Sequence, residues 1–314
     1  MILLGKIATR DAYGKALAEL GHLNPDIVVL DADLSGSTRT AVFAQEFPER
    51  FFNMGIAEAN MMGTAAGLAA AGKIPFASTF AVFATGRAFD QVRNSICYPR
   101  LNVKIAASHA GLTVGEDGAS HQSVEDIALM RALPNMTVLV PADGVETELA
   151  VRAAAEYPGP VYLRLGRPKV PVIFGDDYNF EIGRAASLRE GNDVTIAACG
   201  YMVGPALTAA EMLAGEGIGA RVLNVSTVKP LDGETLVQAA RETGALVTAE
   251  EHSIIGGLGS AVAELLGQEY PVPVLRVGIQ DTFGESGPPE ELLQKYGLTA
   301  GDIVGAVKKA IGMK

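Results

Sequence analysis

Hydrophobic residues occur in short continuous runs along the first half of the chain, at positions 27–33, 73–79, 102–108, 136–142 and 160–165. Runs of this length that are rich in Val and Ile are typical of parallel strands buried on both faces. The stretches between them have the length and apolar spacing of helices, at 57–71, 83–97, 123–132 and 143–156. The alternation predicts a doubly wound α/β domain.

The alternation stops at residues 168–193, where Pro, Gly, Asp and Asn are frequent. Such a composition is typical of a connection between domains. A second alternation follows, with strands expected at 193–199, 219–225, 244–250 and 271–277 and helices at 203–216, 232–242, 257–267 and twice near the C-terminus. We therefore predict two doubly wound domains, the first over residues 1–170 and a smaller one over 193–314, joined by a linker over 171–192.

Composition and charge narrow the class of protein. The 314 residues are 48% hydrophobic, and 36 acidic against 25 basic residues give a formal net charge of −11. The basic residues form no block, which argues against nucleic-acid binding. No apolar run reaches the ~20 residues of a membrane helix, and the N-terminal sequence lacks a signal-peptide pattern. Because Cys97 and Cys199 lie far apart in segments expected to be buried, we expect no disulfide and a cytoplasmic location.

Glu58 is the first candidate for chemistry, since it opens an otherwise apolar helix of small residues. A carboxylate at a helix N-terminus is favourable by itself, because free N–H groups and the helix dipole stabilise it. The apolar surroundings also predict burial, as expected for a carboxyl that donates or shares a proton. Both interpretations of Glu58 remain open at this point.

Aromatic residues follow one of the predicted strands, at Phe80, Phe83 and Phe89. Ordinary burial in the core is sufficient to explain each of them. Arg87 and Asp90, three residues apart on the same predicted helix, are spaced for a local ion pair of little value.

A purely structural role is not sufficient to explain the segment 108–126. Two of the four histidines, His109 and His121, occur there with Asp117, in a Gly-rich loop directly after a predicted buried strand. A polar loop of this length is unusual unless it binds a ligand. The carboxyl ends of parallel strands are also where open α/β sheets bind their ligands.

Several segments of the first half resemble the pyrimidine-binding domain of transketolases: NMGIAEANM, STFAVF, GEDGASHQSVEDIALMRALPNMTVLVPAD and YLRLGRP. In the second half, VLNVSTVKPLD and VTAEEHSIIGGLGSAV resemble the C-terminal domain of the same family. The resemblance covers nearly the whole chain. GIAE, xDGxxHQ and RAFDQ also resemble deoxyxylulose-phosphate synthases, whereas SHAG and the glutamate of GEDG favour transketolase.

The resemblance implies a thiamine-diphosphate-dependent enzyme that transfers a two-carbon ketol unit from a ketose phosphate to an aldose phosphate. Glu58 matches the glutamate that hydrogen-bonds N1′ of the aminopyrimidine and so promotes removal of the thiazolium C2 proton. Phe83 matches the ring that stacks on the pyrimidine, Phe80 a second wall of that pocket, and Asp33 an acid on the cofactor side. Where transketolases carry a further aromatic residue, this chain has Gly86.

The resemblance also implies contacts with the sugar substrates. Asp117 and His121 match residues that contact the hydroxyl and carbonyl-derived oxygens of the donor, and with Glu58 they form the expected catalytic set. Phosphate contacts are implied for four residues from separate loops: Arg10, Ser37, His109 and Arg167. Arg164, on the same strand end, is the alternative to Arg167.

A partner chain is expected as well. Transketolases hold the diphosphate and its metal through a GDG motif and a later Asn in an N-terminal domain, and no GDG occurs in this sequence. The resemblance thus implies an N-terminal partner subunit that binds Mg²⁺ or Ca²⁺, an α2β2 heterotetramer, activity only with that partner, and no metal ligand in this chain. The open alternatives are the β subunit of a 2-oxo-acid dehydrogenase E1, a split deoxyxylulose-phosphate synthase and a non-catalytic scaffold.

Overall fold

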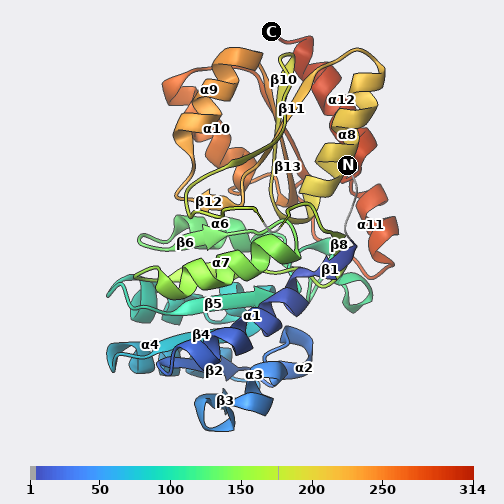
Figure 1. Ribbon diagram of the computed structural model, residues 1–314. Coiled ribbons are helices and arrows are strands. Elements are labelled where there is room, and N and C mark those ends of the chain that lie inside the picture. Colours follow the sequence, from blue (N-terminus) through green and yellow to red (C-terminus); the bar gives the residue numbers. More distant parts are fainter. Residues whose placement is uncertain (1–4, 176) are drawn as a thin grey trace.

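The computed structural model describes residues 5–175 and 177–314. The first four residues of the predicted first domain and Asp176 of the predicted linker lie outside the described residues. Two α/β domains are stacked, with the first domain below and the second above in the view of Figure 1. Both domains were predicted from the alternation of strands and helices, and the α/β class is confirmed.

The first domain is a seven-stranded sheet in the described part of the chain, with the order β12-β6-β7-β5-β4-β2-β3. All neighbouring strands are parallel except β12 against β6. The strands are β2 (Ile27–Asp31), β3 (Phe51–Asn53), β4 (Ile74–Phe80), β5 (Lys104–Ser108), β6 (Thr137–Leu139), β7 (Val161–Arg164) and β12 (Thr227–Lys229). Beside this sheet, β1 (Lys6–Ala8) and β8 (Lys169–Pro171) pair antiparallel.

Helices cover both faces of this sheet (Figure 1). One face packs against α1 (Thr9–Leu23), α3 (Ala41–Glu46) and α7 (Gly144–Glu156). The other packs against α4 (Glu58–Ala70), α6 (Asp126–Ala132) and a helical region made of η2 (Phe83–Arg87), α5 (Phe89–Gln91) and η3 (Val92–Cys97), of which η2 and η3 are π-helical. The short segments α2 (Ser35–Thr38), η1 (Pro48–Arg50) and η4 (Leu112–Asp117) lie in the connections. The wide π-helical turns of η2 and η3 are notable because turns of this kind often occur at functional sites.

The second domain is a five-stranded sheet in the described residues, with the order β14-β13-β10-β11-β9. Its strands are β9 (Ala186–Arg189), β10 (Val194–Ala198), β11 (Ala220–Asn224), β13 (Leu246–Ser253) and β14 (Val274–Ile279), of which only β9 is antiparallel to its neighbour. The helices are α8 (Val203–Gly215), α9 (Gly233–Thr243), α10 (Leu258–Glu269), α11 (Pro289–Lys295) and α12 (Ala300–Ile311), with a 3₁₀ turn, η5 (Gly200–Met202), before α8.

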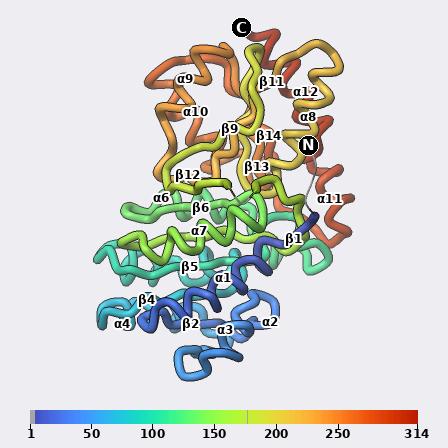
Figure 2. Tube along the Cα trace, viewed as in Figure 1, coloured from blue at the N-terminus to red at the C-terminus, as the bar shows by residue number. Residues whose placement is uncertain are grey.

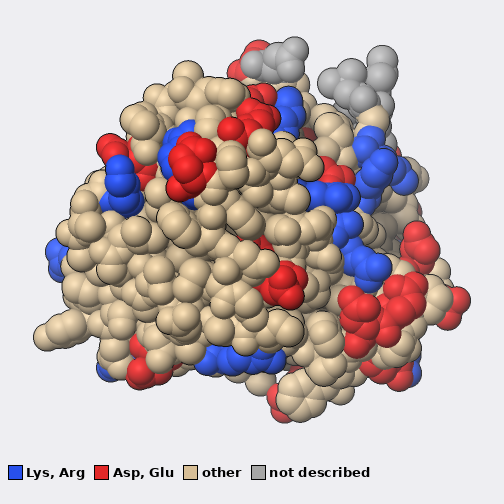
Figure 3. Space-filling view, turned by 90° about the horizontal axis from the view of Figure 1, so that it is seen from below, with Lys and Arg blue, Asp and Glu red and all other residues tan. Residues whose placement is uncertain are grey.

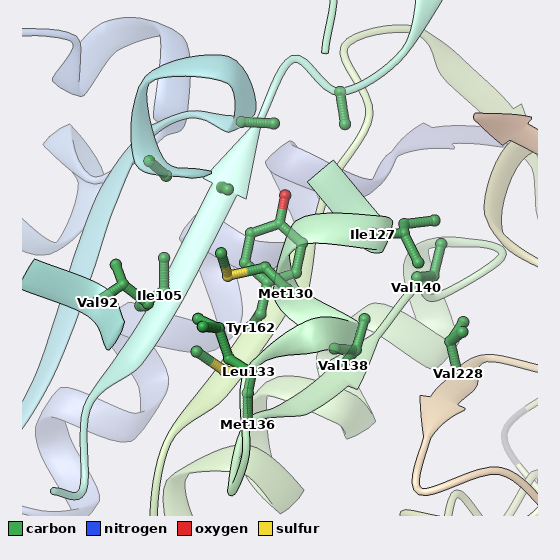
Figure 4. Packing of buried hydrophobic residues seen from close by; sticks show 14 of the residues in the cluster. Val92, Ile105, Ile127, Met130, Leu133, Met136, Val138, Val140, Tyr162 and Val228 are labelled. Atoms are coloured by element: carbon green, nitrogen blue, oxygen red, sulfur yellow. The ribbon is translucent and has the colours of Figure 1, made fainter. Parts of the chain in front are cut away.

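The two domains are joined more closely than the hydrophobic pattern predicts, because one strand of the first sheet comes from the second half of the chain. The chain returns to the first domain after β11, and β12 forms the edge of the first sheet. In Figure 4, Val228 of β12 packs near Val138 and Val140 of the β6 region. A buried Val side chain contributes ~1.5–3 kcal/mol, so β12 stabilises the first domain although its sequence lies in the second.

The predicted linker is also more ordered than its composition indicates, because β9 lies within it and the tube in Figure 2 follows it into the second sheet. Asp143, which caps α7, accepts hydrogen bonds from the backbone N–H groups of Ile173 and Phe174 at 2.6 and 2.9 Å. Buried Glu146 accepts the Tyr178 hydroxyl at 2.9 Å and the side-chain amide of Asn224 at 2.7 Å. The carboxyls of Asp143 and Glu146, at the start of α7, thus hold the connection against both domains.

Candidate active site

The predicted site residues come together at the carboxyl edge of the first sheet. Phe80 is the last residue of β4, and His109 follows β5 directly. Arg10 lies in the first turn of α1, Ser37 follows β2 and Arg167 follows β7. Parallel strands place their carboxyl ends on one side, which explains why residues distant in sequence converge there.

A column of rings forms the centre of the site. His109 stacks on Phe80 with ring centroids 3.9 Å apart, and Phe80 lies nearly parallel to Phe83 at 6.0 Å. His121 approaches the column edge-on, 5.4 Å from Phe83 and 6.3 Å from Phe80. Phe80 and His109 are buried, whereas Phe83 and His121 are partly exposed. The Phe83 ring therefore offers the accessible face on which a planar heterocycle can stack.

Glu58 lies at one end of this column and is almost completely buried, with 1% of its surface exposed. It is the first residue of α4, as predicted. Its Oε1 accepts a hydrogen bond from Arg87 Nη1 at 2.7 Å, and the Arg87 guanidinium lies over the Phe83 ring at 4.3 Å. The expected local pair of Arg87 with Asp90 does not form, since Asp90 accepts instead from Asn94. Arg87 is thus a site residue that the sequence spacing does not reveal.

The other end of the column carries positive charge. Arg10 Nη1 lies 3.2 Å from His109 Nε2 and donates to the Ser37 carbonyl at 3.1 Å. Burial, followed by the nearby charges of Arg39 and Arg167, lowers the pKa of Arg10. Among the described residues Arg10 Nε is buried without a hydrogen-bond partner. A cluster of guanidiniums with a free donor is suited to an anion.

His109 itself is neutral at physiological pH, because burial and the adjacent Arg10 and Arg167 lower its pKa to about 3. Its Nδ1 lies 2.9 Å from the Ser108 hydroxyl. Arg10 has no acceptor, so it donates to Nε2, and the ring proton is then on Nδ1. In this structure His109 therefore orients Arg10 and adds no charge of its own.

Asp117 and His121 lie on the 111–122 loop, which includes the η4 segment. Arg167 Nη1 approaches Asp117 Oδ2 at 3.7 Å and bonds the Val114 carbonyl. The Asp117 side chain is 44% exposed, and the His121 ring is partly exposed against the phenylalanines. Both polar side chains are therefore partly accessible to a ligand.

The structure separates the two candidate arginines after β7. Arg164 is buried, donates to both oxygens of Asp126 at 2.7 and 3.1 Å, and bonds the Glu251 carbonyl. Arg167 keeps 37% of its side chain exposed beside Asp117. Arg164 is thus committed to the core, and Arg167 is the arginine available to a ligand.

Asp33, the predicted acid on the cofactor side, makes no hydrogen bond or ion pair with Glu58, Phe83 or Arg87 among the described residues. It is exposed, adopts a left-handed conformation with φ of 65°, and accepts a hydrogen bond from Asn53. The buried acid of this region is Asp31, which binds the hydroxyls of Thr38 and Thr40 and shapes the loop that carries Ser37.

The residues fit an aminopyrimidine as far as this chain can hold one. Glu58 Oε2 is buried and has no hydrogen-bond partner in the described part of the chain, so one carboxyl oxygen remains for a ring nitrogen. Phe83 offers a ring face, and Gly86 leaves open space where a side chain would begin. Arg87 currently lies on that ring face. In the described residues no group of three or more His, Cys, Asp or Glu is placed to hold a metal ion.

Comparison with known proteins agrees with this geometry. Residues 5–172 match the family described as "Transketolase, pyrimidine binding domain", and residues 183–303 match "Transketolase, C-terminal domain". The chain is 53% identical to the "Putative transketolase C-terminal section" of Methanocaldococcus jannaschii over 94% of this chain and 93% of that protein. It is 49% identical to the "6-deoxy-6-sulfo-D-fructose transketolase subunit SqwH" of Clostridium sp. strain MSTE9, over 97% and 95%. A solved structure described as "Split gene transketolase, inactive beta4 tetramer" is 66% identical, with a TM-score of 0.93 over 98% of this chain and 99% of that one.

The fold and the site define a pyrimidine-binding domain followed by a C-terminal domain of the kind found in thiamine-diphosphate enzymes. The chain belongs to the transketolase family. In the described residues, no helix combines the length and the apolar character needed to cross a membrane.

Proposed function

We propose that this chain is the C-terminal subunit of a split transketolase, which transfers a two-carbon ketol unit between a ketose phosphate and an aldose phosphate. The main observation behind the proposal is a continuous series of contacts. It connects Glu58 through the phenylalanine stack to the arginine cluster. Relatives described as a C-terminal section or a subunit of transketolase, matched over nearly their whole length, support it. Those relatives favour transketolase over a 2-oxo-acid dehydrogenase E1, a deoxyxylulose-phosphate synthase or a scaffold.

The proposed cofactor is thiamine diphosphate, whose thiazolium carbon supplies the nucleophile for ketol transfer when it is bound. Phe83 would stack on the pyrimidine, with Phe80 behind it. Glu58 Oε2 would hydrogen-bond the ring nitrogen, because it is buried and has no other partner among the described residues. A carboxyl in that position can exchange a proton with the nitrogen as a general acid or base. Asp117 and His121 would contact the donor sugar, and its phosphate would be bound by Arg10 and Arg167 through charge-assisted hydrogen bonds, with Ser37 and His109 as the further phosphate contacts.

The diphosphate and its Mg²⁺ or Ca²⁺ would be held by an N-terminal partner subunit, in an α2β2 assembly. The surface near Glu58 is suited to such a partner. Helix α4 carries no charged residue after Glu58, and Phe52 and Ile56 just before it are 39% and 78% exposed. Figure 3 views the molecule from the side of α3, α4 and β3, and most of that face is free of charged side chains. Interfaces are depleted of charge at their centre in the same way.

The isolated chain is expected to bind thiamine diphosphate weakly and to have no ketol-transfer activity. It lacks the GDG motif, and Arg87 lies on the ring face that the pyrimidine would need. Titration calorimetry with the cofactor and Mg²⁺, on this chain alone and mixed with the partner subunit, measures the difference. Tight, magnesium-dependent binding by the chain alone would contradict the two-subunit proposal.

Arg167→Ala is expected to raise KM for a phosphorylated donor strongly, and to affect an unphosphorylated one such as hydroxypyruvate much less. Contacts remote from the reacting carbon mainly supply binding. The ratio of kcat/KM for the two donors in the assembled enzyme measures the effect. Arg184→Ala is a matched control, because the Arg184 side chain is 58% exposed and its partner among the described residues is the exposed Glu234 of the second domain. Equal losses on both donors would assign Arg167 to the scaffold or the cofactor.

A further inference from the structure

The conformation of the 111–122 loop is not fixed by the first domain alone. Gly111 and Gly118 have φ of 83° and 75°, a region that residues with a side chain rarely adopt. Its local hydrogen bonds are those of a short 3₁₀ turn, such as Gly118 N–H to the Gly115 carbonyl at 3.1 Å. Since Asp117 and His121 lie on this loop, the position of the proposed donor contacts depends on what else holds it.

The second domain contacts the beginning of the loop through Glu251 of β13. The Thr113 N–H donates to Glu251 Oε1 at 2.7 Å, and Glu251 is only 3% exposed. A β-carbon on Gly111 would lie 2.3 Å from that same oxygen. The Glu251 carbonyl in turn accepts from Arg164 at 2.9 Å, which ties this anchor to the core pair with Asp126. The loop therefore starts against a fixed carboxyl of the second domain.

The middle and the end of the loop meet the segment that precedes α11. Gln122 Nε2 is shared by the carbonyls of Leu112, Gly115 and Glu285, at 3.3, 3.0 and 2.9 Å. The Ser286 hydroxyl donates to the Glu116 carbonyl at 2.6 Å. That carbonyl belongs to the residue before Asp117, so the Ser286 bond acts directly on the backbone that aims the Asp117 side chain.

The contacting segment is itself held in place. Lys295, the last residue of α11, pairs with the Glu285 carboxylate, and the Tyr296 hydroxyl donates to the Phe283 carbonyl at 3.2 Å. In Figure 1, α11 extends down from the second domain beside the first. The segment of the second domain that contacts the loop is thus itself held in place by an ion pair and a hydrogen bond.

We propose that the C-terminal domain positions the donor-binding loop, with Glu251 and Ser286 as its positioning residues. The proposal rests on the proposed function, in which Asp117 and His121 contact the donor. Ser286 and Glu251 touch no substrate in this scheme. They act by holding the backbone that leads into Asp117, at Thr113 and at Glu116.

Ser286→Ala tests the proposal, because it removes one hydrogen bond and keeps the β-carbon that packs near Gly118. Ser187→Ala is the matched control, since Ser187 lies in β9 of the same domain and its hydroxyl donates to the exposed Glu190 side chain. We expect faster hydrogen exchange at the amides of residues 112–122 in the Ser286 variant of the full chain. In the enzyme assembled with its partner subunit, we expect KM for a ketose phosphate donor to rise about 2- to 10-fold, as the loss of one hydrogen bond implies. The kcat and the Kd for thiamine diphosphate should change little.

Exchange and KM equal to wild type in Ser286→Ala would overturn the positioning role. A fall in the amount of folded enzyme without a change in KM would overturn it too, because that result describes a purely structural serine. Asp117→Ala and His121→Ala separate this failure from a failure of the proposed function. If both leave donor kinetics unchanged, the loop does not bind the donor; if both impair them while Ser286→Ala does not, only the positioning proposal falls.

Discussion

Glu58→Gln in the assembled enzyme is expected to slow hydrogen–deuterium exchange at C2 of bound thiamine diphosphate by about 10²- to 10⁴-fold. The amide keeps the shape of the side chain and fits the same buried position, where 1% of Glu58 is exposed. It cannot hold or give up a proton as the carboxyl does. The exchange rate of the C2 proton, followed by NMR after acid quench, measures the effect directly.

Glu49→Gln provides the control for this substitution. Glu49 lies in the same domain, its side chain is 68% exposed, and it pairs only weakly with neighbouring Arg50 at 3.5 Å. The control variant should exchange at the wild-type rate. If Glu58→Gln exchanges at that rate as well, Glu58 is only a helix-start charge with Arg87 as its counter-ion.

Arg164→Met is expected to destabilise the chain by about 3–5 kcal/mol, because it leaves the buried carboxylate of Asp126 without its counter-ion. Burial by itself would raise the pKa of Asp126, but the Arg164 guanidinium outweighs it and holds that pKa below its usual value. The Tyr162 hydroxyl, which donates to Asp126 at 2.7 Å, cannot replace a full positive charge. Urea-induced unfolding followed by circular dichroism measures the loss.

Two further variants sharpen this expectation. Adding Asp126→Asn to Arg164→Met removes the uncompensated charge and should recover part of the lost stability. Arg167→Ala should stay within about 1 kcal/mol of wild type, since its side chain is 37% exposed and its ion pairs are 3.7 Å long. Equal destabilisation by the Arg164 and Arg167 variants would contradict the division between a core arginine and a ligand arginine.

The elements that the hydrophobic pattern predicted best are the central strands. Every residue of β2 and β5 is buried, and continuous apolar runs are the direct consequence of burial on both faces. The helices predicted from the pattern did not include α1, although its residues Ala12, Ala16 and Leu17 have the spacing of a buried helix face. The edge strand β12 was not predicted either, because three residues carry no period and its partner β6 is about ninety residues away.

The sequence by itself determined the residue types of the site and the strand ends that carry them. Sequence motifs identify Glu58, Phe83, His109 and Asp117, and this identification does not depend on the exact position of any helix. Only the tertiary structure decided which charges meet. Arg87 pairs with Glu58, twenty-nine residues away, rather than with nearby Asp90, because the packing of α4 against the π-helical turn brings them within 2.7 Å.

The tertiary structure also decided the charge state of His109 and the separate roles of Arg164 and Arg167. Burial and neighbouring guanidiniums keep His109 neutral, and neither is visible in a local pattern. Arg164 faces Asp126 from the last position of β7, while Arg167 emerges three residues later at the surface beside the 111–122 loop. Motifs specify which side chains are present, whereas desolvation and the distance between charges depend on all the elements that pack around them.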